Sequence, residues 1–214
     1  MVEQSSVLVP RAGNRELDLP VPTREEWDRR HREAGEEPPQ PARVLAENVH
    51  LLPVHGRAAD LASGLGANAR LLARRGLETW AWDLSGVAIE RLARASAAEG
   101  LALRAEQRDI VARPPEPGTF DVICVVRFLE RALFPALIAA LRPGGLLFYQ
   151  TFTRERVSDC GPSRDAFRLE RNELLGLAGD LIVRVYREEG TAGDTSRGWR
   201  DEAMLVAQKL PDGS

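Results

Sequence analysis

Residues 57–68 read Arg-Ala-Ala-Asp-Leu-Ala-Ser-Gly-Leu-Gly-Ala-Asn, a short apolar run that ends in two closely spaced glycines. The pattern predicts a strand over 57–62, a sharp turn at Gly64 and Gly66, and a helix near 67–75. A turn of this kind follows the carboxyl end of a strand, which is where open α/β sheets bind their ligands. This stretch therefore predicts both an α/β fold and the place of its site.

The sequence that follows this stretch repeats the alternation of strand and helix. Further strands are expected at 78–83, 101–108, 120–128, 145–152, 181–188 and 202–209, with helices over 86–99, 130–141 and near 170–178. The continuous apolar run 120–128 is typical of a strand buried on both faces. We therefore predict an α/β fold, a three-layer, doubly wound, mostly parallel seven-stranded sheet. The last two strands have no helix between them, so the final strand should run antiparallel.

The length of 214 residues, with 43% hydrophobic and 29% charged residues, fits one domain with a full core. Residues 1–22 are polar and proline-interrupted, and are expected to form an extended amino-terminal arm. Thr23 and Glu26 have the spacing of a capping box, which predicts a helix over 23–34, and 41–52 should form another. We predict one domain over 23–210, with a helical lid at 23–52 and a short tail at 211–214.

Charge and cysteine content limit the class of protein. The net charge is −3 without a basic block, which argues against a nucleic-acid partner. The amino-terminal residues show neither a signal peptide nor an apolar span, so no membrane partner is expected. Cys124 and Cys160 have no neighbours at metal-ligand spacing and form no disulfide framework. We expect a cytoplasmic protein without a metal site, either a monomer or a homodimer.

Asp60 distinguishes two ligand classes at the glycine turn. Residues 64–69 also match the dinucleotide fingerprint G-x-G-x-x-A, a weak signal by itself. A pyrophosphate at this turn would be repelled by the Asp60 carboxylate, whereas a cationic ligand would be attracted. A second carboxylate, Asp83, ends the next strand and can accept hydrogen bonds from ribose hydroxyls.

These motifs resemble those of the class I S-adenosylmethionine-dependent methyltransferases, and among them the tellurite-resistance and thiopurine methyltransferase branch. The resemblance runs from about Trp27 to Leu210. Residues 60–66 look like the first motif of that family, with Ala62 where many members have glycine and Ser63 where cysteine is common. The turn at 141–145 (Leu-Arg-Pro-Gly-Gly), the strand start at 120–123 and the segment 27–31, which closes over the cofactor in that branch, are also similar.

The resemblance implies S-adenosyl-L-methionine as cofactor, with S-adenosyl-L-homocysteine as product, and it implies a set of site residues. Asp83 corresponds to the ribose-binding acid, and Asp109 with Ile110 to the pair that holds the adenine amino group. The cofactor-binding set is Asp60, Ala62, Ser63, Gly64, Gly66, Asn68, Asp83, Leu84, Asp109, Ile110, Arg127 and Trp27. Arg127, His31 and Tyr149 are the residues expected at the catalytic centre and in the substrate pocket.

The expected reaction is in-line methyl transfer to a small-molecule acceptor in a bacterial enzyme. A thiol or a selenium or tellurium oxyanion fits best, because such nucleophiles need little help from a base. The sequence after the fourth strand is not Asn/Asp-Pro-Pro-Tyr, and no Pro-Cys dipeptide exists, which argues against methylation of nucleic-acid bases. An NAD(P)-dependent oxidoreductase and a non-catalytic cofactor-binding regulator remain alternatives. The arginines at 154, 156, 164 and 168 form either an anion-attracting mouth or a solvated loop.

Overall fold

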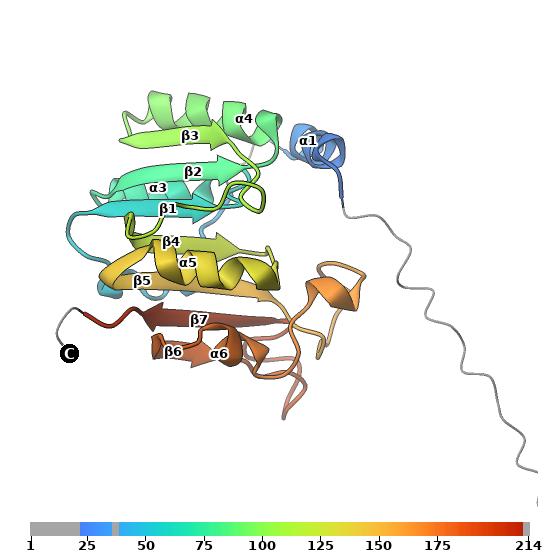
Figure 1. The fold of residues 1–214 in the computed structure, drawn as a ribbon. Helices are drawn as coiled ribbons and strands as arrows, with labels where there is room; N and C mark the ends of the chain where they lie inside the picture. The colour runs from blue at the N-terminus through green and yellow to red at the C-terminus, as the bar shows by residue number, and fades with distance from the viewer. Residues whose placement is uncertain (1–21, 36–38, 212–214) are drawn as a thin grey trace, which may run out of the picture.

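One sheet of seven strands, in the order β3-β2-β1-β4-β5-β7-β6, organises the computed structural model, which describes residues 22–35 and 39–211 (Figure 1). The strands are β1 (Arg57–Leu61), β2 (Glu78–Asp83), β3 (Leu103–Gln107), β4 (Phe120–Val126), β5 (Leu141–Phe152), β6 (Ile182–Arg187) and β7 (Glu202–Gln208). Strands β1 to β5 pair in parallel, and β7 is antiparallel to both of its neighbours. The predicted sheet and its reversed last strand are confirmed. The predicted arm falls almost wholly in residues 1–21, outside the described part of the chain.

Alternation along the central strands divides the core into two layers, one on each face of the sheet. One face receives Ala58, Val122, Cys124, Phe148 and Val206. The other face receives the side chains that alternate with them, among them Ala59, Ile123, Leu147 and Leu205. Both sets are fully buried, as expected for strands covered on both faces.

The helices cover the two faces unequally. Helices α2 (Arg43–Ala46), α3 (Ala67–Arg74) and α4 (Gly86–Ala98) contribute buried residues to the face of Ala58. Helices α5 (Phe134–Ala140) and α6 (Glu173–Leu177) pack on the opposite face, in front of the sheet in Figure 1. The result is the predicted three-layer arrangement.

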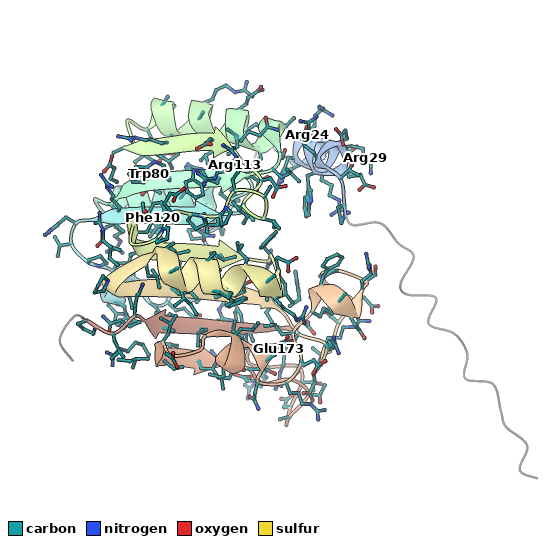
Figure 2. All side chains as sticks on the ribbon, in the orientation of Figure 1. Arg24, Arg29, Trp80, Arg113, Phe120 and Glu173 are labelled. Atoms are coloured by element: carbon teal, nitrogen blue, oxygen red, sulfur yellow. The ribbon has the colours of Figure 1, made fainter. Side chains whose placement is uncertain are left out.

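The chain between β3 and β4 crosses the sheet without a helix, and aromatic rings take the helix's place. Trp80 and Trp82 lie on the same face of β2, and each packs edge-on against Phe120, with ring centroids 5.6 and 5.8 Å apart. Figure 2 labels Trp80 and Phe120, which belong to β2 and β4, the two strands on either side of β1. The Arg108 guanidinium lies 3.9 Å from the centroid of the Trp82 ring. The tryptophan face of β2 therefore packs into the core.

The expected helix over 41–52 is interrupted. It forms α2 and a separate 3₁₀ turn, η2 (Val49–Leu51). The break falls at Asn48, whose side-chain amide donates to the carbonyl of Val44 at 2.9 Å, while its φ of −119° leaves the helical region. A short polar side chain that bonds its own backbone competes with the helical ladder in this way.

Two other helices are shorter than expected. The segment predicted as a helix over 130–141 begins with a 3₁₀ turn, η3 (Arg131–Leu133), and becomes α-helical at Phe134, next to a proline in the first turn. The helix expected near 170–178 spans Glu173–Leu177, because Asn172 adopts a left-handed conformation with φ of 58°. Both changes concern helix ends, where local signals are weakest.

Helix α1 (Arg24–Glu33) lies beyond the carboxyl ends of the parallel strands and packs against α4 (Figure 1). The predicted capping box is present, since the Glu26 amide donates to the Thr23 hydroxyl and the Thr23 amide to the Glu26 carboxylate. None of the residues of α1 is fully buried. The helix is therefore a cover on the outside of the domain and not part of its core.

Candidate active site

The carboxyl ends of β1 and β2 bring the predicted glycine turn and Asp83 into contact. The Gly64 amide donates to Asp83 Oδ2 at 2.7 Å, and the Ser63 amide donates to the Trp82 carbonyl at 3.0 Å. These bonds join two loops that are about twenty residues apart in the chain. The turn and the acidic strand end therefore form one surface at this edge of the sheet.

Asp60 lies beneath this surface as a buried carboxyl group with a single backbone partner. Its side chain is 1% exposed, its Oδ2 accepts from the Ala69 amide at 2.9 Å, and Oδ1 has no partner within the described residues. Burial, with a smaller contribution from the nearby Asp83, raises the pKa of Asp60 to about 8. A buried acid with one unpartnered oxygen favours a cationic ligand beside it.

The same contact argues against a phosphate at this turn. Ala69 is the third residue of α3, and its amide is one of the donors that a helix start offers to an anion. The carboxyl of Asp60 already accepts from that donor, so the amide is not available to a phosphate, and the carboxyl adds negative charge there once it ionises near pH 8. The predicted repulsion of a pyrophosphate thus has a structural basis, which disfavours the dinucleotide-dependent oxidoreductase.

The glycine turn is a run of left-handed residues. Ala62, Gly64 and Gly66 have φ of 53°, 52° and 74°. A Cβ at Gly66 would lie 2.3 Å from the Cδ1 of Leu92 on α4, so this glycine allows the two helices to approach. Ala62 occupies a position whose backbone favours glycine, and its methyl group costs about 1 kcal/mol there.

Asp83 uses both carboxylate oxygens to fix the turn and the start of α4. Its Oδ1 accepts from the Ser85 amide at 2.8 Å, while Oδ2 holds Gly64. Asp83 is 8% exposed, and Leu84 next to it is partly exposed. Each carboxylate oxygen has a second lone pair, so Asp83 can accept a further hydrogen bond from a ligand hydroxyl.

Helix α1 covers the turn with two aromatic residues. His31 stacks on Trp27 with ring centroids 6.0 Å apart, and its Cε1 lies 3.4 Å from the position that a Cβ of Gly64 would take. Burial lowers the pKa of His31, so its imidazole is neutral at pH 7; the Asp83 charge acts in the opposite direction. His31 is thus close to the predicted cofactor turn.

Polar contacts that the sequence did not reveal hold α1 in place. The Asp28 carboxylate accepts from the Ser85 hydroxyl at 2.6 Å and from the Val87 amide at 3.3 Å, at the start of α4. The Arg91 guanidinium donates to the carbonyls of His31, Ala34 and Gly35, which satisfies the end of α1. Both contacts join segments more than fifty residues apart, and a lone arginine on a helix gives no signal of such a role.

Asp109 and Ile110 follow β3 but differ in exposure. Asp109 is exposed, and its Oδ1 caps the next turn by accepting from the amides of Val111 and Ala112. Ile110 is 4% exposed and belongs to the core. The structure gives Asp109 no contact with the glycine turn, so its adenine-binding role stays a prediction.

Arg127 ends β4 in a left-handed conformation with φ of 55°. Its Nε donates to Glu202 Oε1 at 2.8 Å, while the side chain remains 62% exposed. The Glu202 carboxylate is buried and also accepts from the Gln150 amide group. Neither Glu202 nor Gln150 was identified from the sequence, because each lies inside a strand that reads as core.

Tyr149 belongs to the interior of the domain. Its side chain is 1% exposed, its ring lies 4.8 Å from that of Phe134, and its hydroxyl donates to the Phe128 carbonyl at 2.6 Å. Burial raises the pKa of Tyr149 far above its ordinary value. A hydroxyl in this position cannot take a proton from an acceptor, so the structure does not support Tyr149 as a base.

The arginines of the loop after β5 have different roles. Arg168 is fully buried, and its guanidinium donates to the carbonyls of Pro162, Thr153 and Cys160, which clamps the loop. Arg154 pairs with Glu170 at 2.7 Å on the surface. Arg168 therefore organises the loop from within, and only the exposed arginines can face a ligand.

Residues 22–35 and 39–211 contain neither a membrane-spanning helix nor a cluster of metal ligands. None of the helices there is long and apolar enough to cross a membrane. No group of three or more histidine, cysteine or acidic side chains is placed to hold a metal ion in this part of the chain.

The residues at the turn fit S-adenosylmethionine. Two buried polar atoms there, Asp60 Oδ1 and Ser63 Oγ, have no hydrogen-bond partner within the described residues. Each can therefore accept a hydrogen bond from a donor group of a ligand. The positive charges of the cofactor would be met by Asp60, and its ribose by Asp83. The Cε1 of His31 is the nearest atom to the position that a Cβ of Gly64 would take, at 3.4 Å.

Comparisons with known proteins agree with this geometry. Residues 58–145 match the model of a family described as methyltransferase domain. A comparison with curated proteins gave no match. TehB from Haemophilus influenzae is a solved structure of similar fold, with a TM-score of 0.62 and 20% identity over 78% of this chain and 61% of that one.

Two further solved structures cover more of their own chains. An S-adenosylmethionine-dependent methyltransferase from Mesorhizobium loti has a TM-score of 0.61 and 18% identity over 78% of this chain and 98% of that one. A structure described as "Conversion of a Disulfide Bond into a Thioacetal Group during Echinomycin Biosynthesis" has a TM-score of 0.65. It shares 22% identity over 89% of this chain and 93% of that one.

The domain match and the site together support a methyltransferase with S-adenosylmethionine as cofactor and S-adenosylhomocysteine as product. The sequence-based expectation of enzyme class and cofactor is confirmed. The narrower branch, with tellurite-resistance and thiopurine methyltransferases, stays a prediction.

Proposed function

We propose that this enzyme transfers the methyl group to a small acceptor with a soft nucleophile, either a thiol or a selenium or tellurium oxyanion. When bound, S-adenosylmethionine supplies a methyl group on a positively charged sulfur that leaves readily. The residues of this chain then have to position the acceptor and exclude water. An acceptor that is already strongly nucleophilic makes a base unnecessary.

The carrying observation is the placement of Tyr149 and His31, the two side chains expected at the catalytic centre that could act as a base. The Tyr149 hydroxyl is buried and donates to the Phe128 carbonyl. The His31 ring lies against Gly64 and Trp27, on the cofactor side of the site. Neither is placed to deprotonate an alcohol or an amine, which an oxygen or nitrogen acceptor would require.

The similar structures add support of a weaker kind. One was solved in work on the conversion of a disulfide bond into a thioacetal group, which is sulfur chemistry, and another is TehB. At 22% and 20% identity they share the fold with this chain, and fold alone does not determine an acceptor. The proposal therefore depends on the site residues.

A methyl-transfer screen tests the proposal. Purified protein is incubated with labelled S-adenosylmethionine and alkyl thiols, selenite or tellurite, with alcohols and amines of matched size as the comparison set. We expect turnover with one of the first group and background rates with the second. Preferred methylation of an alcohol or amine would refute the proposal, and cofactor binding without any turnover would favour the non-catalytic regulator.

A further inference from the structure

The Arg127 guanidinium is held in one orientation by a buried carboxylate. Its Nε donates to Glu202 Oε1 at 2.8 Å, and its Cζ lies 5.6 Å from the centroid of the Phe152 ring. The backbone is fixed as well, because the Arg127 amide donates to the Gln150 carbonyl at 2.7 Å. A non-glycine residue with φ of 55° costs about 1 kcal/mol, and such strain persists where the surrounding structure fixes it.

Glu202 cannot turn away from this arginine. Its side chain is 8% exposed, and its Oε2 accepts from Gln150 Nε2 at 2.6 Å. Gln150 in turn accepts from the Val44 amide at 2.9 Å through Oε1, and is 2% exposed. A buried carboxylate is costly unless it is paired, so the chain Val44–Gln150–Glu202 acts as a fixed support for Arg127.

The two terminal nitrogens of Arg127 remain available. Within the described residues neither Nη1 nor Nη2 donates a hydrogen bond, and the side chain is 62% exposed although its Nε is anchored. The Nη pair of a guanidinium presents parallel N–H groups that match the two oxygens of a carboxylate or another oxyanion.

The position of this fork relates it to the cofactor turn. Strand β4 pairs with β1 in the register Asp60 with Cys124 and Leu61 with Val125. Arg127 lies two residues beyond Val125, so it is at the same edge of the sheet as the glycine turn that follows β1. It lies on the β5 side of that edge, where Phe152 and the clamped loop after β5 are found.

We propose that Arg127, positioned by Glu202, binds an anionic group of the methyl acceptor, so that the substrate class is a nucleophile bearing a carboxylate or another oxyanion. This inference rests on the proposed methyl transfer to a small acceptor. It adds the charge of the acceptor and the residue that recognises it. Arg127 is then a substrate-binding residue, and Glu202 is a positioning residue.

The test uses two thiols that share the 3-mercaptopropionyl group, 3-mercaptopropionate and its uncharged methyl ester, in two assays. The first measures the KM for methyl transfer with the wild type, Arg127→Gln and Arg127→Lys. The second titrates each thiol calorimetrically into protein saturated with S-adenosylhomocysteine, where no methyl donor is present. Arg74→Gln is the matched control, because Arg74 is also half-exposed and paired with a glutamate, but lies on the surface of α3.

The wild type should prefer the acid to the ester, and Arg127→Gln should remove that preference. For the acid we expect KM to rise and affinity to fall by about tenfold or more, as when a charge-assisted hydrogen bond is lost. The KM and affinity of the ester, and the affinity for S-adenosylhomocysteine, should change little. Arg127→Lys should restore part of the preference because it keeps the charge without the fork. Arg74→Gln should behave like the wild type.

The two proposals fail separately. If neither thiol is methylated but the acid still binds in an Arg127-dependent manner, the soft-nucleophile function fails and the anion site stands. If the wild type binds acid and ester equally, or Arg127→Gln keeps the preference, the anion site is refuted whatever the turnover. Glu202→Gln tests the positioning role. It should weaken binding of the acid selectively, whereas equally weaker binding of acid and ester would indicate a merely structural role.

Discussion

Replacing Asp60 with asparagine should make the protein more stable at alkaline pH and, at the same time, weaken its hold on the cofactor. The side chain is 1% exposed and its pKa is raised to about 8, against 3.8 for a free aspartate. Because the pKa in the folded state is the higher one, the stability is fully present below pH 3.8. It falls as the pH rises, and levels off above pH 8.

The magnitude follows from this interval. Each pH unit between the two pKa values removes about 1.4 kcal/mol, which gives an upper limit of about 6 kcal/mol at pH 9. Relaxation and entry of water reduce the cost of a buried carboxylate to a few kcal/mol. Asparagine keeps an oxygen for the Ala69 amide, which Asp60 Oδ2 now accepts at 2.9 Å, and carries no charge at any pH.

Urea unfolding of the wild type and Asp60→Asn at pH 5, 6, 7, 8 and 9 measures the effect. The free energies of unfolding should be similar near pH 5 and diverge by about 2 kcal/mol or more at pH 9, with the variant more stable. Other titrating groups cancel in the difference. Parallel pH profiles would show that Asp60 is not the buried ionising group described above.

Binding should change in the opposite direction. A charge-assisted hydrogen bond contributes about 1.5–3 kcal/mol, so Asp60→Asn should bind S-adenosylhomocysteine about tenfold or more weakly by calorimetry. In the wild type the affinity should increase as the pH rises toward 8, because the ionised carboxyl attracts the ligand's ammonium group. A variant that is more stable and binds equally well would remove Asp60 from the site.

Three further predictions concern other parts of the site. Asp83→Asn should weaken S-adenosylhomocysteine binding at least about tenfold in a calorimetric titration, since the ribose hydroxyls lose a charged acceptor; unchanged affinity would exclude Asp83. Ala62→Gly should raise the free energy of unfolding by about 1 kcal/mol in urea titrations, because φ is 53° there; a loss of stability would contradict the strain. Arg168→Met leaves three loop carbonyls without their donor and should cost about 3 kcal/mol, with new protease cleavage between residues 153 and 168; an intact, resistant loop would refute the clamp.

Much of the fold could be predicted from local patterns. The two glycines after β1, the capping box at Thr23 and the apolar run of β4 each act over a few residues, and each appears where expected. The carboxyl ends of parallel strands meet at one edge, so the proximity of Gly64 and Asp83 followed from the pattern alone. Helix ends were predicted less well, because single side chains such as Asn48 decide them.

Roles that depend on burial could not be predicted. Tyr149 ends inside the core although it is near the end of a strand, and Arg168 is buried although its segment is polar. A strand residue points to one face or the other according to the register of the sheet, and a loop arginine is buried only when carbonyl groups surround it.

The sequence by itself determined the sheet, its glycine turn and the carboxyl groups of Asp60 and Asp83 at the strand ends, because periodicity and turn chemistry are local. Only the tertiary structure decided that Arg127 meets Glu202 across 75 residues, and that Val44 meets Gln150 across 106. Pairs this distant form when the packing of several strands brings them together and removes water from between them. No pattern within either segment encodes such a partner.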